Sequence, residues 1–116
     1  MQQVNTKENL ISAADLSILL TKLYRGEILD DWHRNLLFSF MHDTETEDRI
    51  PAGLPKETKI YHKSGTFANV VHDSAIVDDG KRPFVLVVLS SGEASEKFKV
   101  GKIVEITKRA WQFENE

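Results

Sequence analysis

Residues 70–89 read VVHDSAIVDDGKRPFVLVVL and predict two adjacent strands of a sheet. Two predicted strands, Val70–Val77 and Phe84–Leu89, flank Asp78–Lys81, whose Asp-Gly pair is typical of a tight turn between antiparallel strands. Phe84–Leu89 is apolar at every position, whereas a strand exposed on one face would alternate. It therefore predicts a strand that is covered on both faces and lies centrally in a sheet.

A further strand is predicted ahead of this hairpin. From Thr58 onward, Ile60 and His62 alternate with Lys and Tyr residues, until Gly65 interrupts the pattern. This stretch and the hairpin together predict a three-stranded antiparallel sheet.

Two helices are predicted before the sheet. The first begins with Ser12 as N-cap, Asp15 completes a capping box, and Gly26 ends the helix. The second begins near Asp30 or Asp31, since either carboxylate can cap it. Each helix carries apolar rows at helical spacing: Leu16, Leu19, Leu20 and Leu23 in the first, and Trp32, Leu36 and Phe40 beside Leu37 and Met41 in the second.

The second helix ends in the charged run His42–Asp48, of which Glu45–Asp48 is interpreted as a solvated loop. Residues 49–55 contain two prolines and a glycine and predict another loop. Helical spacing returns from about Ala94 to Phe113, where Val100, Val104, Thr107 and Trp111 share one face.

The expected fold class is α+β, with two N-terminal helices, a three-stranded antiparallel sheet and a C-terminal helix. Residues 1–116 would form one unit, with a lead-in over 1–11, a helical part over 12–43 and the sheet plus C-terminal helix over 58–113. A simple meander would place Phe84–Leu89 at a sheet edge, where a long apolar strand is an association site. We therefore expect dimerisation, strand exchange or the C-terminal helix to cover that edge, and self-association through Phe84–Leu89 is a predicted interaction.

Composition excludes several classes of function. The 116 residues include 15 Lys and Arg against 18 Asp and Glu, a formal charge of −3, so nucleic acid is not an expected partner. The apolar runs are too short to span a membrane, and the absence of Cys excludes disulfides, thiolate chemistry and cysteine zinc sites. The four histidines lack metal-ligand spacing, so neither a metal nor a cofactor is expected.

Two short segments could carry chemistry. His72-Asp73 is a candidate acid–base pair, but adjacent strand residues point to opposite faces, which favours a structural histidine. The segment from Lys63 to Thr66 could receive a carboxylate: Lys63 supplies charge, Ser64 a hydrogen bond, and Gly65 room for a ligand near the backbone. Taken alone, the same residues also fit a surface lysine before a strand bulge.

Four segments resemble the class A β-lactamase family in order and spacing: IPAGLP at 50–55, HKSG at 62–65, HDSAIV at 72–77 and RPFVLVVL at 82–89. The stretch NLISAADL at 9–16 resembles a helix start well before the family's Lys-Thr/Ser-Gly strand, and Trp111 fits its C-terminal helix. The resemblance runs from about Asn9 to Trp111, but it covers only the C-terminal half or less of the family's domain. In the family, strands from the N-terminal part pair beside the strand equivalent to Phe84–Leu89.

The resemblance implies roles for individual residues. Lys63 would attract the carboxylate of a β-lactam or a D-alanyl peptide, Ser64 would hydrogen-bond the same group, and Gly65 would complete this substrate-binding wall. The backbone N–H of Thr66 would be one donor of the oxyanion hole. The family is extracytoplasmic, whereas Met1–Asn5 carries neither the charge nor the apolar stretch that starts a signal peptide.

The family's nucleophile is not found in this sequence. No serine is followed three residues later by a lysine, and Ser-Asp-Asn is absent. The glutamate that activates water for deacylation has no assigned counterpart either. We therefore expect no catalytic residues and no hydrolysis by this chain alone. Two alternatives stay open: a binding module that retains carboxylate affinity without chemistry, and an unrelated small α+β interaction protein.

Overall fold

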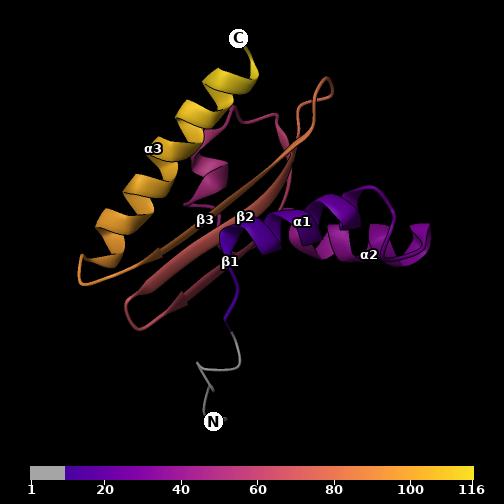
Figure 1. Cartoon of the computed structure of the whole chain (residues 1–116). Coiled ribbons are helices and arrows are strands. Elements are labelled where there is room, and N and C mark those ends of the chain that lie inside the picture. Colours follow the sequence, from indigo (N-terminus) through magenta and orange to yellow (C-terminus); the bar gives the residue numbers. More distant parts are fainter. Residues whose placement is uncertain (1–9) are drawn as a thin grey trace.

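The computed structural model describes residues 10–116, and they have the expected α+β architecture (Figure 1). The elements in chain order are α1 (Ala13–Tyr24), α2 (Asp31–Met41), the 3-10 helix η1 (Ile50–Gly53), β1 (Lys59–Phe67), β2 (Val70–Asp78), β3 (Phe84–Ser91) and α3 (Glu96–Glu114). Most of the expected lead-in, residues 1–9, lies outside the described residues. Within the expected loop 49–55, the chain forms η1.

The helix boundaries follow from local signals in the sequence. Each α-helix has an N-cap residue whose side-chain oxygen accepts a hydrogen bond from a backbone N–H of the first turn. These N-caps are Ser12, Asp30 and Ser95. Of the two candidates for α2, Asp30 is therefore the cap. Gly26 has a φ of +75°, a conformation that glycine adopts without strain, and it ends α1 as predicted.

The sheet is an antiparallel meander in the order β1-β2-β3. The prediction that Phe84–Leu89 lies centrally is wrong, because β3 is an edge strand among the described residues and β2 is the central strand. Five consecutive residues of β2, Asp73–Val77, are buried. The polar residues His72, Asp73 and Ser74 conceal this central position in the sequence.

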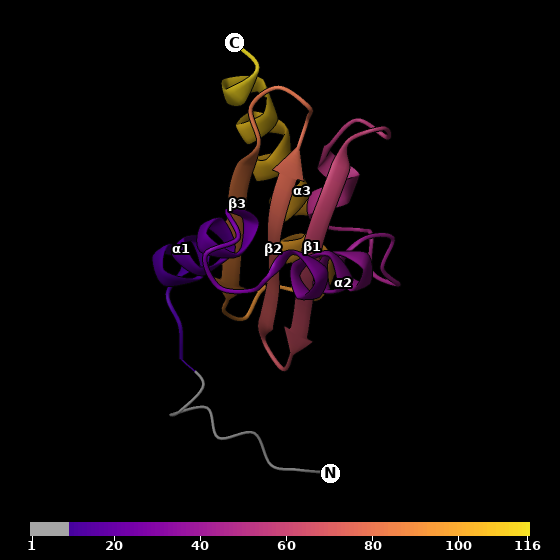
Figure 2. The same ribbon diagram turned by 90° about the vertical axis from the view of Figure 1, so that its right-hand side faces the viewer.

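Both faces of the sheet are covered, which explains the unbroken apolar sequence of β3. Phe84, Leu86 and Val88 pack with the core under α3, whereas the alternate residues Val85 and Val87 pack with the core under α1 and α2. Figure 2 shows α1 and α2 in front of the sheet and α3 behind it. The two-sided cover predicted for this strand is therefore confirmed.

On α2, only part of the apolar surface faces the core. Phe38 and Met41 are buried, and the Phe38 ring stacks on Tyr61 of β1 with ring centroids 4.4 Å apart. The row that contains Trp32 and Phe40 points away, since these side chains are 69% and 71% exposed. The helix is thus anchored to β1 through one face and leaves a second apolar face uncovered by the described residues.

Candidate functional site

The segment Lys63–Thr66 lies in the second half of β1, which forms the other edge of the sheet. The register with β2 is continuous from Lys59 opposite Asp78 to Phe67 opposite Val70, so this pairing contains no bulge. An edge strand directs part of its backbone N–H and C=O groups away from its neighbour. The candidate receptor is therefore a straight, exposed strand edge.

Lys63 and Ser64 project from opposite faces of β1, because successive strand residues alternate. Tyr61, on the same face as Lys63, packs with the core under α1 and α2, whereas Ile60, on the Ser64 face, packs with the core under α3. The exposed Lys63 folds back, and its Nζ donates to the Ser64 carbonyl over 2.6 Å. A ligand that contacts both side chains must lie along the strand edge, where the two faces meet.

Gly65 leaves space on this edge. A Cβ atom built at Gly65 has no heavy atom within 4 Å, and its φ lies outside the left-handed region. Neither packing against the described residues nor backbone strain therefore requires glycine at this position. The open volume is available to a ligand that approaches the strand closely.

Arg49 adds a second positive charge that the sequence did not reveal. Its side chain is almost fully buried, and Nη2 donates to Thr66 Oγ1 over 2.5 Å. Among the described residues, the buried Nε of Arg49 has no hydrogen-bond partner. In sequence Arg49 ends a charged run 17 positions before Thr66, and nothing local links the two residues.

The position of Arg49 is fixed by the start of η1. The Ile50 N–H donates to Asp73 Oδ2 of β2 over 3.0 Å. At the other end of η1, a Cβ on Gly53 would lie 2.7 Å from Thr107 Cβ, so η1 packs against α3 more closely than any larger residue allows. The segment that carries Arg49 is therefore held between β2 and α3.

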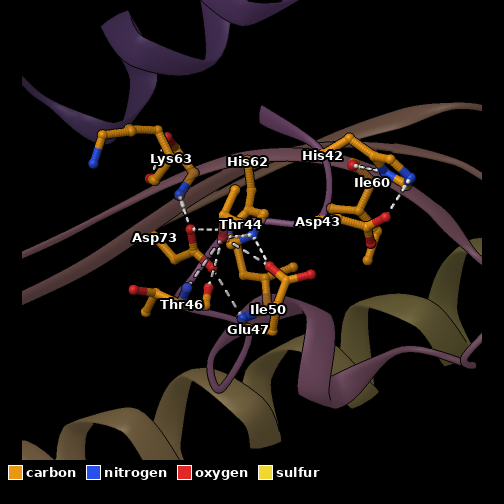
Figure 3. A network of polar contacts seen from close by, with 11 residues as sticks. His42, Asp43, Thr44, Thr46, Glu47, Ile50, Ile60, His62, Lys63 and Asp73 are labelled. Carbon is orange, nitrogen blue, oxygen red and sulfur yellow. Dashed lines mark hydrogen bonds and ion pairs between the residues drawn. The ribbon is translucent and has the colours of Figure 1, made fainter. Parts of the chain in front are cut away.

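The buried imidazole of His62 lies close to Glu47 and Ile50, which flank Arg49 in the sequence (Figure 3). His62 is 1% exposed; its Nδ1 lies 2.9 Å from Asp73 Oδ1, and its Nε2 lies 2.5 Å from Glu47 Oε2. Glu45–Asp48 is a loop, as interpreted, and its half-exposed Glu47 also contacts His62. Asp73 pairs with His62, whereas His72 accepts a hydrogen bond from the backbone N–H of Ser90 over 3.0 Å, a structural role as predicted.

The charge state of His62 follows from its neighbours. Burial disfavours the charged imidazole, but the hydrogen bonds and negative charges of Asp73 and Glu47 outweigh it and hold the pKa of His62 above its ordinary value of 6.5. Both ring nitrogens face carboxylate oxygens, so the imidazolium can donate to each of them.

The network contains the elements of a hydroxyl–imidazole–carboxylate triad. Thr44 Oγ1 lies 3.1 Å from His62 Nε2, and Asp73 lies on the other ring nitrogen. A general base must be unprotonated, however, and Glu47 favours the protonated imidazole at the same nitrogen. Thr44 also lies within 2.9 Å of Glu47 Oε2, to which its hydroxyl can donate. While the ring is protonated, it cannot accept the proton of the Thr44 hydroxyl.

A cavity of about 330 Å³ lies near the start of β1, lined by His42, Asp43, Glu47, Pro51, Ala52, Leu54, Pro55, Lys56, Thr58 and Ile60, and Lys63–Thr66 do not line it. Within residues 10–116, no group of three His, Cys, Asp or Glu residues is arranged to hold a metal ion. None of the helices over the same residues is both long and apolar enough to cross a bilayer.

The described fold matches part of the β-lactamase-like fold. The sequence matches the β-lactamase enzyme family over residues 1–113, and the chain belongs to this family. No curated protein matches the sequence.

Solved structures share this fold. PBP-A is 31% identical over 90% of this chain, with a TM-score of 0.84. A β-lactamase from Burkholderia vietnamiensis is 19% identical over 98% of the chain with a TM-score of 0.84, and an ancestral class A β-lactamase is 20% identical over 97% with a TM-score of 0.81. The chain spans only 40%, 46% and 48% of these three structures, respectively.

Proposed function

We propose that this chain forms the carboxylate-binding wall of a β-lactam-recognising site and does not hydrolyse β-lactams by itself. The observation that carries the proposal is the receptor edge of β1, defined as Lys63–Thr66, with the Arg49 guanidinium hydrogen-bonded to Thr66. Lys63 and Arg49 supply positive charge, while Ser64 and Thr66 supply hydroxyl groups on the Arg49 side of the strand. Charge-assisted hydrogen bonds of this kind favour an anionic ligand.

A β-lactam or a D-alanyl peptide end carries the carboxylate that this edge would bind. A variant of PBP-A is described as an acyl-enzyme complex with penicillin G, and the wild-type PBP-A structure is 31% identical to this chain. In our proposal, Lys63 and Ser64 contact the carboxylate, Gly65 admits the ligand, and the Thr66 N–H donates to the carbonyl oxygen that a nucleophile would attack.

Hydrolysis needs a nucleophile and a base within hydrogen-bond reach of each other. Among the described residues, the hydroxyl group found near an imidazole is that of Thr44, and the pKa of that imidazole is raised by Asp73 and Glu47 against the effect of burial. With no Ser-x-x-Lys in the sequence, the expected activity of the purified chain is binding without turnover.

Two measurements test the proposal. Benzylpenicillin at millimolar concentration should shift the backbone amide signals of residues 63–66 in an NMR titration, and nitrocefin should be hydrolysed no faster than in buffer. Lys63→Met should abolish the shifts, whereas Lys108→Met, which removes an exposed charge on α3, should leave them intact. Unchanged amide signals in the wild type would refute binding, and nitrocefin turnover above the buffer rate would refute the lack of activity.

A second candidate function, self-association through β3, is favoured by the unpaired edge of this strand. Within the described chain, Phe84–Ser91 pairs only with β2, and α1 and α3 cover its faces but do not extend the ladder. An apolar strand of this kind pairs readily with another strand. Light scattering should then show a concentration-dependent dimer with slow amide exchange along β3, whereas a stable monomer with fast exchange there would contradict it.

A further inference from the structure

We propose that His62 is a positioning residue: as an imidazolium it bridges Asp73 and Glu47, and this bridge holds Arg49 at the receptor edge. The inference rests on the proposed function and adds a condition to it, namely that the anion site is fully formed only while His62 is protonated. His62 itself is buried and lies away from the ligand, so it acts through Arg49.

The sheet side of the bridge is rigid. Asp73 is fully buried in the central strand β2, and its Oδ1 lies 2.9 Å from His62 Nδ1. The same carboxylate accepts the N–H of Ser74 over 3.1 Å and, through Oδ2, the N–H of Ile50 over 3.0 Å. Ile50 directly follows Arg49, so the carboxylate that binds the ring also fixes the chain on one side of Arg49.

The loop side of the bridge fixes the chain on the other side. Glu47, two residues before Arg49, lies 2.5 Å from His62 Nε2 through its Oε2. Glu47 is 43% exposed, so its position depends on this contact more than on packing. Arg49 is therefore held from both sides: Ile50 is attached to Asp73, Glu47 is attached to His62, and the guanidinium reaches Thr66.

Deprotonation would break one side of the bridge. A neutral imidazole has a single N–H and can donate to only one carboxylate. The buried Asp73 has no access to water and would retain the N–H, whereas the half-exposed Glu47 would face an unprotonated nitrogen and turn to water. The segment before Arg49 would then lose its attachment to β1 and keep only the local hydrogen bond from Thr44 to Glu47, so Thr66 would lose a fixed guanidinium partner.

The imidazole faces no compensating cation in the contacts of the described residues. The groups that face it are Asp73 from β2, and Glu47 and the Thr44 hydroxyl from the loop. Next to it, η1 and α3 meet through uncharged Gly53 and Thr107. On its own strand, Lys63 projects from the opposite face. Two carboxylates therefore control its protonation, and removal of either should lower the pH at which the bridge opens.

The test is an NMR pH titration of the wild-type chain without ligand, from about pH 5.5 to about pH 9. We expect the His62 ring, the Ile50 and Thr66 amides and the Arg49 side-chain signals to change with one midpoint, above the ordinary histidine value of 6.5. In Glu47→Gln the common midpoint should fall. In the control Glu45→Gln, an exposed carboxylate in the same loop, it should stay within error. Signals of Arg49 and Thr66 that do not follow the His62 midpoint would overturn the proposal.

Benzylpenicillin then separates this inference from the proposed function. Its affinity should fall about tenfold from pH 6 to pH 8.5, equivalent to one hydrogen bond to a charged group, and the fall should follow the His62 midpoint. Affinity that is constant across this range would overturn the positioning role but not the carboxylate site. No binding at pH 6 would refute the carboxylate site, while the ligand-free titration would still decide whether His62 positions Arg49.

Discussion

Replacement of Gly65 by Ala separates the roles of fold and ligand at the receptor edge. A Cβ at this position meets no atom within 4 Å, and the backbone is not in the left-handed region. Glycine inside a strand is less stable than alanine by roughly 0.5–1 kcal/mol, because it loses more backbone entropy on folding. Gly65→Ala should therefore leave the free energy of unfolding unchanged or raise it by up to about 1 kcal/mol.

Binding should change in the opposite direction. If a carboxylate ligand lies against the Gly65 backbone, the added methyl group occupies part of its volume. Forcing a methyl group into a packed contact costs about 1–3 kcal/mol. The dissociation constant for benzylpenicillin should therefore rise roughly 5- to 150-fold. The variant should thus be at least as stable as the wild type and bind clearly less well.

Urea denaturation and an NMR titration with benzylpenicillin measure the two quantities on the same sample. Gly101→Ala on α3 is the matched control, since a Cβ there also meets no atom within 4 Å; it should raise stability by about 0.5–1 kcal/mol without affecting affinity. Wild-type affinity in Gly65→Ala would refute the approach of the ligand along this edge. A loss of stability above about 1 kcal/mol would refute the assignment of open space at Gly65.

Three further predictions concern the segment around η1. Gly53→Ala should lower the free energy of unfolding by about 1–3 kcal/mol in urea denaturation, because its Cβ would lie 2.7 Å from Thr107 Cβ; wild-type stability would contradict the close contact of η1 with α3. Arg49→Lys keeps the charge but loses the planar donor fork, so benzylpenicillin affinity in the NMR titration should fall about fivefold to tenfold, and an unchanged affinity would mean that charge alone suffices. Burial opposes protonation of His62, but Asp73 and Glu47 together raise its pKa above 6.5; its stabilising effect is therefore complete below about pH 6.5 and lost as pH rises through the native pKa. Urea denaturation across this range should show the decline, and a profile that rises there would contradict it.

The sequence predicted the elements well because their signals are local. A capping serine at Ser12, a capping aspartate at Asp30 and the Asp-Gly turn of residues 78–81 each act within a few residues of the boundary they set. Strand order depends on contacts between distant segments. The expectation that β3 lies centrally was wrong, because Asp73 and its polar neighbours made the central strand β2 look less buried than the apolar edge strand.

The site was predicted only in part, for the same physical reason. Lys63–Thr66 are contiguous, and their chemistry is visible in the sequence. Arg49 reaches Thr66 only because η1 docks between β2 and α3, and His62 meets Asp73 only because the strand register places Asp73 one inward position from Ala75, the direct partner of His62. One signal was available: the alternation of β1 places His62 inward beside Ile60, and a buried imidazole requires polar partners.

The edge position of β3 also bears on how the protein can be handled. Its eight residues, Phe84–Ser91, carry no charge, and the nearest charged residues in sequence are Arg82 and Glu93. Natural sheets interrupt such edges with lysine, proline or a bulge, which keep molecules from stacking strand to strand into fibres. In this protein the nearest charged residues lie just outside the strand and not within it. Storage at high concentration should therefore favour β-rich aggregates. The substitution Ser91→Lys, at the exposed end of β3, should keep the protein in solution for longer.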